Sequence, residues 1–207
     1  MQRRHFFSRA SQYMLGALSL PALNAAAISA GDKVELNVRS VESLTVLTIN
    51  GAIQKHNRGK IDAALDQLMY KQGIRFDRAY TFDLNTLDNL PGVTIHPTME
   101  YDGRVHQLSG PRLSEVLNLV GVVKSKSTQI LFHGIDGYSP EISLANALNY
   151  DYVIATRIDG QLLSIGGFGP LFAIVDADRI PELAQKPVQQ RFDRCPWGLY
   201  SIEVVAG

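Results

Sequence analysis

The sequence predicts one α+β domain in which short strands outnumber helices. Segments rich in β-branched and aromatic residues recur along the chain, separated by Asn-Gly, Pro-Gly and Asp-Gly turns, a pattern typical of antiparallel strands. Two other segments place apolar residues at the i, i+3, i+4 spacing of a helix. No internal repeat or linker-like stretch divides residues 31–207, so we expect them to form a single domain.

The first elements are a strand and a helix. Residues 43–51 read SLTVLTING and predict a strand that closes on an Asn-Gly turn. A helix ending at Gly73 is predicted from apolar residues that share one face: Ile61, Ala64, Leu65, Leu68 and Met69. Residues 81–110 then predict short strands divided by turns at residues 91–92 and 102–103.

A second helix is predicted after Pro111, which suits a first helical turn, and it ends at Gly121. Its buried stripe consists of Leu113, Val116, Leu117 and Val120. Residues 128–144 read TQILFHGIDGYSPEISL and predict two strands around an Asp-Gly turn.

The last third of the chain predicts a hairpin, two strands and a loop. The hairpin turns at Asp159-Gly160, and residues 169–176 (GPLFAIVD) form a mostly apolar, buried strand. Residues 177–195 are polar and contain two prolines, so we expect a loop or short helix there. Residues 197–205 (WGLYSIEVV) form the final strand.

The glycine-rich stretch at residues 159–175 has two interpretations, a phosphate-binding loop or a tight turn that enters a core strand. A phosphate site needs N–H groups at a helix N-terminus or in a nest, with a Lys, Arg, Ser or Thr beside it. Pro170 has no N–H group, and the stretch contains no Lys or Arg. The residues therefore favour the turn.

Composition places the chain among ordinary globular proteins. It has 45% hydrophobic and 19% charged residues, and its 20 basic side chains balance 20 acidic ones. This balance gives no charge argument for binding nucleic acid. No apolar run approaches the roughly 20 residues that span a bilayer, so we expect no membrane span after signal removal.

The N-terminus predicts an export signal peptide over residues 1–27. Three arginines precede an apolar segment at residues 13–23, and small residues that suit cleavage follow it; an amphipathic helix is the weaker alternative. Arg3 and Arg4, followed by Phe6 and Phe7, resemble the twin-arginine motif, although a general secretory signal can also contain two arginines. By either route we expect a periplasmic protein.

The order of motifs carries a resemblance to a known family. The chain contains, in order, GPRLSEVLNLVG, HGIDGYSPEISL, ATRIDGQLL, GPLFAIV and a late IEV. This series resembles the molybdopterin-binding domain of the sulfite oxidase family over about residues 44–205, closest to its small stand-alone proteobacterial members. The resemblance implies that family's fold of mixed β-sheets with flanking helices. It also implies a molybdenum atom held by a pterin dithiolene and a cysteine thiolate.

The chain departs from the family pattern where the cofactor is held. The family's cysteine is expected within residues 93–110, which contain none; Met99 or Tyr101 lies there instead. Gly167 and Phe172 stand where longer members have a histidine and an arginine that suit the pterin phosphate. Without cationic partners, burial of that phosphate is costly. Cys195 is the single cysteine, so the chain cannot form an internal disulfide. It does not lie at the position of the family's cysteine. Arg191 and Arg194 flank it, and nearby cations favour a reactive thiolate.

Five residues are candidates for lining the family's cofactor cleft: Tyr101, His133, Tyr138, Arg157 and Gly169. Arg157 best suits an anion because of its guanidinium fork, and the alternative is a surface arginine on a hairpin strand. A group of acidic and imidazole side chains matches no compact metal motif, so we assign no metal site to it: His96, Glu100, Asp102 and His106. No catalytic residue is assigned.

Two functions from different classes fit these features. The first is a molybdopterin-dependent oxidoreductase that binds the cofactor without a protein thiolate, which the twin-arginine-like signal favours. The second is a cofactor-free periplasmic ligand-binding or sensor-accessory module, which the missing Cys, His and Arg favour. The expected partners are a small anionic ligand or a pterin, and a membrane-bound sensor or redox protein. Enzymatic activity is left open.

Overall fold

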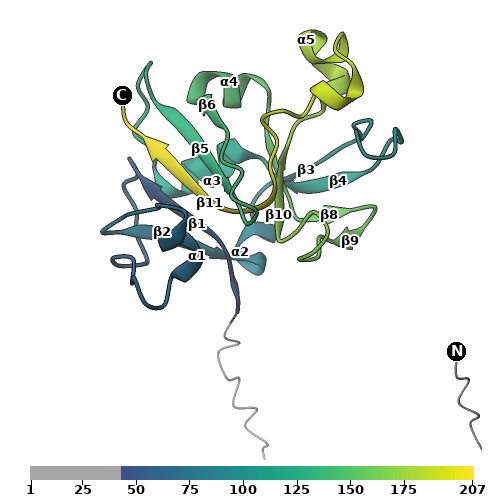
Figure 1. Cartoon of the computed structure of the whole chain (residues 1–207). Helices are drawn as coiled ribbons and strands as arrows, with labels where there is room; N and C mark the ends of the chain where they lie inside the picture. Colours follow the sequence, from purple (N-terminus) through teal and green to yellow (C-terminus); the bar gives the residue numbers. More distant parts are fainter. Residues whose placement is uncertain (1–42) are drawn as a thin grey trace, which may run out of the picture. The chain divides into compact units, whose positions relative to one another are not determined.

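The computed structural model describes residues 43–207, and the predicted signal peptide lies outside these residues (Figure 1). The described residues form two sheets with short helices, which confirms the predicted α+β class. The larger sheet has seven strands: β1 (Thr45–Gly51), β2 (Ala79–Asp83), β5 (Gln129–Gly134), β6 (Glu141–Ser143), β7 (Val153–Ala155), β10 (Leu171–Ile174) and β11 (Trp197–Val205). The smaller sheet has four: β3 (Gly92–Ile95), β4 (Leu108–Pro111), β8 (Arg157–Ile158) and β9 (Gln161–Leu162).

The helices are short and alternate with strands along the chain. They are α1 (Gln67–Lys71), α2 (Leu84–Asp88), α3 (Leu113–Val120), α4 (Leu144–Asn149) and α5 (Pro181–Ala184), with 3₁₀ turns η1 (Ala177–Arg179) and η2 (Val188–Gln190). None of the helices within residues 43–207 is long and apolar enough to cross a membrane. The three short elements after β10 match the loop or short helix predicted there.

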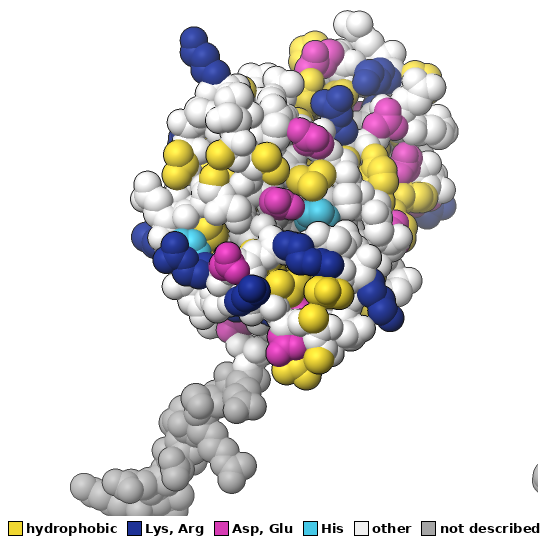
Figure 2. All heavy atoms as spheres, turned by 60° about the vertical axis from the view of Figure 1, so that its left-hand side comes forward, with side chains coloured by type: hydrophobic (Ala, Val, Ile, Leu, Met, Phe, Trp, Pro, Cys, Tyr) yellow, Lys and Arg dark blue, Asp and Glu magenta, His cyan; other side chains and the backbone are white. Residues whose placement is uncertain are grey.

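The predicted final strand is confirmed as β11, and it organises the larger sheet. β11 pairs in parallel with β1 and antiparallel with β5 and β10, and β7 pairs with β10. Most apolar side chains of these strands are buried in one core, including all of β10. On the face that Figure 2 turns forward, basic and acidic side chains are interspersed, so no field of one sign covers it.

Helix α3 forms where its periodicity predicts. Its stripe is buried, and Gly121 caps its C-terminus in the left-handed conformation at φ 70°. Its start differs from the prediction, because Pro111 ends β4 and Arg112 is the N-cap. Pro111 therefore pairs opposite Gly92 in the smaller sheet and contributes no helical turn.

The predicted first helix is wrong over most of its length. Only α1 is helical, and Leu65 is 84% exposed. Asp62 Oδ1 accepts hydrogen bonds from the backbone N–H groups of Ala64 and Leu65, and Asp66 Oδ2 accepts one from Asp62. These side chains satisfy backbone donors in a turn, so they compete with a helix at its first residues.

The glycine-rich stretch is a turn that enters a core strand. Asp159 and Gly160 both have positive φ, at 49° and 79°, and form the predicted hairpin turn between β8 and β9. In the loop that follows, the N–H groups of Gly167 and Gly169 both donate to the carbonyl of Ser164. A Cβ at Gly169 would lie 2.6 Å from the carbonyl carbon of Ser164, so close backbone contact accounts for this glycine.

Candidate functional site

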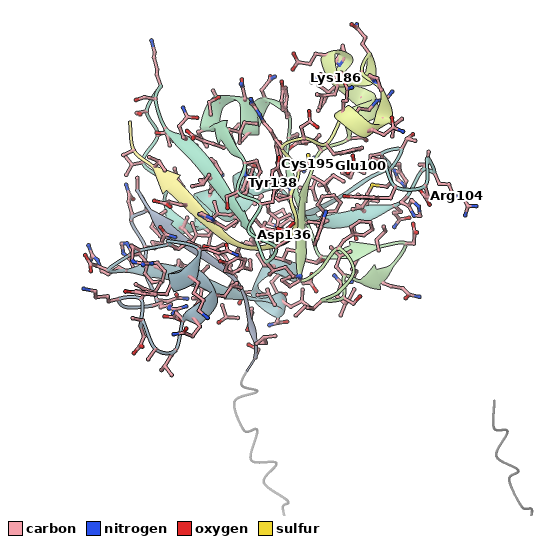
Figure 3. The ribbon with its side chains drawn as sticks, in the orientation of Figure 1. Glu100, Arg104, Asp136, Tyr138, Lys186 and Cys195 are labelled. Carbon is pink, nitrogen blue, oxygen red and sulfur yellow. The ribbon has the colours of Figure 1, made fainter. Side chains whose placement is uncertain are left out.

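A pocket of about 190 Å³ lies where three loops meet. The β3–β4 loop, the β5–β6 turn and the segment before β11 each supply one acidic and one aromatic residue, with Cys195 at the wall (Figure 3). We call it the acid–aromatic pocket; its lining residues are Glu100, Tyr101, Asp136, Tyr138, Phe192, Asp193, Cys195, Pro196 and Trp197.

The β5–β6 turn is held in place by its own residues. Asp136 Oδ1 accepts a hydrogen bond of 3.0 Å from the N–H of Tyr138, and Gly137 takes a φ of 91° that favours glycine. The Tyr138 hydroxyl donates to the carbonyl of Asp193. This bond ties the turn to the segment before β11, so two walls of the pocket are linked.

An apolar cavity of about 480 Å³ adjoins this pocket and shares Tyr101 and Trp197 with it. We call it the aromatic face; its residues are Tyr101, Ile135, Gly166, Gly167, Phe168 and Trp197. The ring centroids of Tyr101 and Phe168 are 5.5 Å apart, and Phe168 stacks on Phe172 at the same distance. Tyr101 is 58% exposed, so its ring is available to a bound molecule.

The titratable groups of the pocket have raised pKa values, for which burial is the largest cause and neighbouring carboxylates are a further one. Burial and the neighbouring Glu100 carboxylate raise the pKa of Tyr101 to about 12. Burial, followed by the Asp193 carboxylate, raises the pKa of Tyr138. The pKa of the Cys195 thiol is also raised to about 12, mainly by burial, with added contributions from Glu100 and Asp193. An anion in this pocket would lose hydration and be repelled by these carboxylates.

Cys195 is only 6% exposed, and its Sγ lies 3.9 Å from the Tyr152 hydroxyl. The residue also lines a second cavity of about 300 Å³, the basic pocket. The cations of that pocket are Lys186, Arg191 and Arg194. Arg191 is held within the protein, because it pairs with Asp178 and donates to two backbone carbonyls.

The structure brings together two of the five predicted cleft residues, Tyr101 and Tyr138. Arg157 lies in another cavity, where its guanidinium donates two bonds of 2.8 Å to the carboxylate of Asp88. His133 is buried, with Nδ1 3.1 Å from Ser139 Oγ and Nε2 3.7 Å from Glu203, and burial lowers its pKa. Gly169 packs on the backbone of residues 163–164.

The histidine of the β3–β4 loop joins two turns. His106 Nε2 lies 3.0 Å from Asp102, and its Nδ1 lies 2.6 Å from Asp159 in the β8–β9 turn. Hydrogen bonds to Asp102 and Asp159 raise the pKa of His106, and His106 lowers the pKa of both carboxyl groups. In residues 43–207, no group of three or more His, Cys, Asp or Glu side chains could hold a metal ion.

This arrangement predicts a pH-dependent contribution to stability. Replacing His106 with Gln is expected to lower the melting temperature most between pH 3.8 and 6.5, the ordinary pKa values of the two kinds of group. The protonated imidazole stabilises the fold below its unfolded pKa, and this contribution is lost as the pH rises through its raised folded pKa. The contribution of the Asp102 and Asp159 carboxylates to stability is lost as the pH falls through their lowered folded pKa values. His56→Gln is the control, since His56 makes no ion pair with a described residue. A melting-temperature difference that does not change with pH would contradict the assignment.

The Cys195 thiol is expected to be inert in the folded protein. Its burial and raised pKa leave almost no thiolate at neutral pH. Ellman's reagent should therefore label it at least tenfold more slowly in buffer than in denaturant. Rapid labelling of the folded chain would mean that the thiol is reachable and ionised.

Comparison with known proteins identifies the class. Residues 66–176 match the model of the oxidoreductase molybdopterin binding domain, and the chain belongs to this family. This match confirms the resemblance of the motifs. Among solved structures, the sulfane dehydrogenase SoxCD from Paracoccus pantotrophus is similar, with 15% sequence identity and a TM-score of 0.49. The match covers 77% of this chain and 37% of that one, so the chain spans less than half of the solved relative. A search of curated protein sequences finds no match.

Proposed function

We propose that this chain is an exported member of its family that binds a ligand in the acid–aromatic pocket and holds no molybdenum through a protein thiolate. The observation that carries the proposal is the chemistry of this pocket, which Tyr101 and Tyr138 line together with carboxylates from three loops. The protein would act as a periplasmic binding module, with a membrane-bound protein as its partner. Residues 1–27, with their signal-like order, support the export.

The residues of this pocket do not fit the family's cofactor. A pterin phosphate needs cations or N–H donors, whereas Glu100, Asp136 and Asp193 bring negative charge. Molybdenum on a dithiolene takes a thiolate, whereas the side chain of Cys195 is only 6% exposed and its Sγ lies against the Tyr152 hydroxyl. No step of the proposed function therefore passes through molybdopterin.

A second candidate function rests on the basic pocket. Lys186 and Arg194 line a cavity that also reaches Cys195, and this charge suits a small anionic ligand or a pterin phosphate. On this alternative the chain is a molybdopterin-dependent oxidoreductase, with its anion bound between η2 and the segment before β11.

Metal and pterin analysis of the processed protein distinguishes the two. The full chain is expressed in a host that makes molybdenum cofactor and exports it, and the purified protein is analysed by mass spectrometry for molybdenum and by fluorescence for oxidised pterin. The proposal predicts neither above background. Near-stoichiometric molybdenum would support the second candidate, and its loss in a Lys186→Ala, Arg194→Ala variant but not in Lys60→Ala would locate it. Sequencing the N-terminus of the periplasmic fraction tests the export.

A further inference from the structure

We infer that the acid–aromatic pocket and the aromatic face together form a binding site for a small organic cation, a substituted ammonium group on an apolar body. The inference rests on the proposed function in one respect, namely that this pocket is the ligand site. It adds the chemical class of the ligand, which follows from the charge and the aromatic rings of the lining.

The lining of the acid–aromatic pocket is acidic, and the cation that acts on it lies outside the lining: Arg194 lowers the pKa of Tyr138 from the basic pocket, which Asp193 also lines. Glu100, Asp136 and Asp193 come from three separate loops and line one pocket. None of them forms an ion pair with a described Lys, Arg or His side chain, and the pocket lining contains no such residue. Three carboxylates around one cavity favour a ligand that brings positive charge.

The aromatic rings specify an organic cation. Tyr101, Tyr138 and Trp197 line the same pocket as the carboxylates. Aromatic faces attract ammonium groups through the ring quadrupole, and Trp and Tyr are the residues that bind substituted ammonium ligands. A hard metal ion would instead need convergent oxygen ligands, and no group of three or more such side chains within residues 43–207 could hold one.

The aromatic face supplies the place for the apolar body. It continues from the pocket through the shared Tyr101 and Trp197, and its other side chains are Ile135 and Phe168. The pocket of about 190 Å³ is large enough for the charged group alone, and the cavity of about 480 Å³ accepts the remainder of the molecule. A ligand with its cation at one end and an aromatic or alkyl group at the other would bury both.

The single tryptophan makes binding directly measurable, because Trp197 lies at the junction of the two cavities. The exported, processed chain is titrated with benzyltrimethylammonium, benzylamine, benzyl alcohol and benzoate, and Trp197 fluorescence is recorded. Both cations are expected to give a saturable change, with an affinity at least tenfold higher than benzyl alcohol and none detectable for benzoate. Raising the salt concentration should weaken the cations selectively.

Matched variants separate charge from shape. Asp136→Asn and Asp193→Asn are each expected to weaken benzylamine binding about tenfold and to leave benzyl alcohol unchanged. The asparagine at 136 keeps the oxygen that accepts from Tyr138, so the turn is retained. Tyr101→Leu should weaken the cations about threefold. The controls are Asp77→Asn and Tyr70→Leu, at an exposed acid and an exposed tyrosine outside the site.

The inference is overturned if cations and benzyl alcohol bind equally or if no probe binds. It is also overturned if a variant that combines Asp136→Asn with Asp193→Asn binds benzylamine as the wild type does while remaining folded by circular dichroism. Failure of the proposed function is a different result, namely molybdenum and pterin in the purified protein. If the protein contained no cofactor and also bound no cation, the cation-site inference would be wrong and the proposed function would stand.

Discussion

Replacing Phe172 with alanine is expected to lower the free energy of unfolding by about 3–5 kcal/mol, the usual cost of truncating a buried phenylalanine. Phe172 is 1% exposed, pairs with Ala155 and Trp197 across two strand neighbours, and stacks on Phe168. The resemblance of the motifs predicts an arginine at this position in the longer members of the family. Phe172→Arg should fail to fold, because its charge would be buried without a partner. Urea denaturation followed by circular dichroism measures both effects.

Phe168→Ala is the matched control for Phe172. Phe168 is only partly buried and lines the aromatic face, so its loss should destabilise the fold less and weaken benzylamine binding more. The opposite outcome would contradict the placement of Phe172 in the core. In particular, a stable Phe172→Arg protein that gained affinity for phosphate would mean that position 172 faces an open cleft.

Short-range sequence patterns predicted the turns, helices and strands that depend mainly on residues close together in the chain. The hairpin at Asp159-Gly160 and helix α3 with its Gly121 cap depend on positive φ and on periodic apolar residues, and both formed. The buried strand β10 followed from an uninterrupted apolar run. The order of these motifs predicted the family. The family match confirms this, since it covers residues 66–176, which contain the hairpin, α3 and β10.

The error at the first helix came from capping side chains. Asp62 and Asp66 bind backbone N–H groups and delay the first helix to Gln67. Capping side chains also begin two helices that were not predicted. Both are shorter than two turns, so their apolar residues show no helical periodicity. Asp83 accepts from the N–H of Thr86 at the start of α2, and Ser143 begins α4 in the same way.

The site was only partly predictable because its lining comes from three loops. Tyr101 and Tyr138 were identified, but Trp197 and Asp193 became part of the same pocket only through the path of the segment before β11. The signal that could have indicated the pocket is the pairing of an acid with a nearby aromatic residue in each loop. Arg157 was predicted to face an anion, and its partner Asp88 lies 69 residues away in sequence, which no local pattern shows.

Gly110→Ala is expected to destabilise the protein by about 3 kcal/mol, although it adds a single methyl group. Gly110 is where β4 of the smaller sheet meets β7 of the larger one. A Cβ there would overlap the carbonyl oxygen of Ile154 and lie 2.9 Å from Cα of Ala155, and both are backbone atoms that cannot turn away. The two strands would have to separate, and the loop that follows β3 and carries Tyr101 would move with them.

Gly92→Ala is the control for this prediction, because Gly92 lies in β3 beside the same strand and a Cβ there would come no closer than 3.5 Å to a neighbouring atom. Its stability should stay within about 0.5 kcal/mol of the wild type in urea denaturation. If the junction also positions the binding loop, Gly110→Ala should lose benzylamine affinity under conditions where it is still folded, and Gly92→Ala should keep it. Equal stability of the two variants would show that β4 and β7 lie farther apart than the contact at Gly110 implies. It would also contradict the coupling between this junction of the sheets and the pocket.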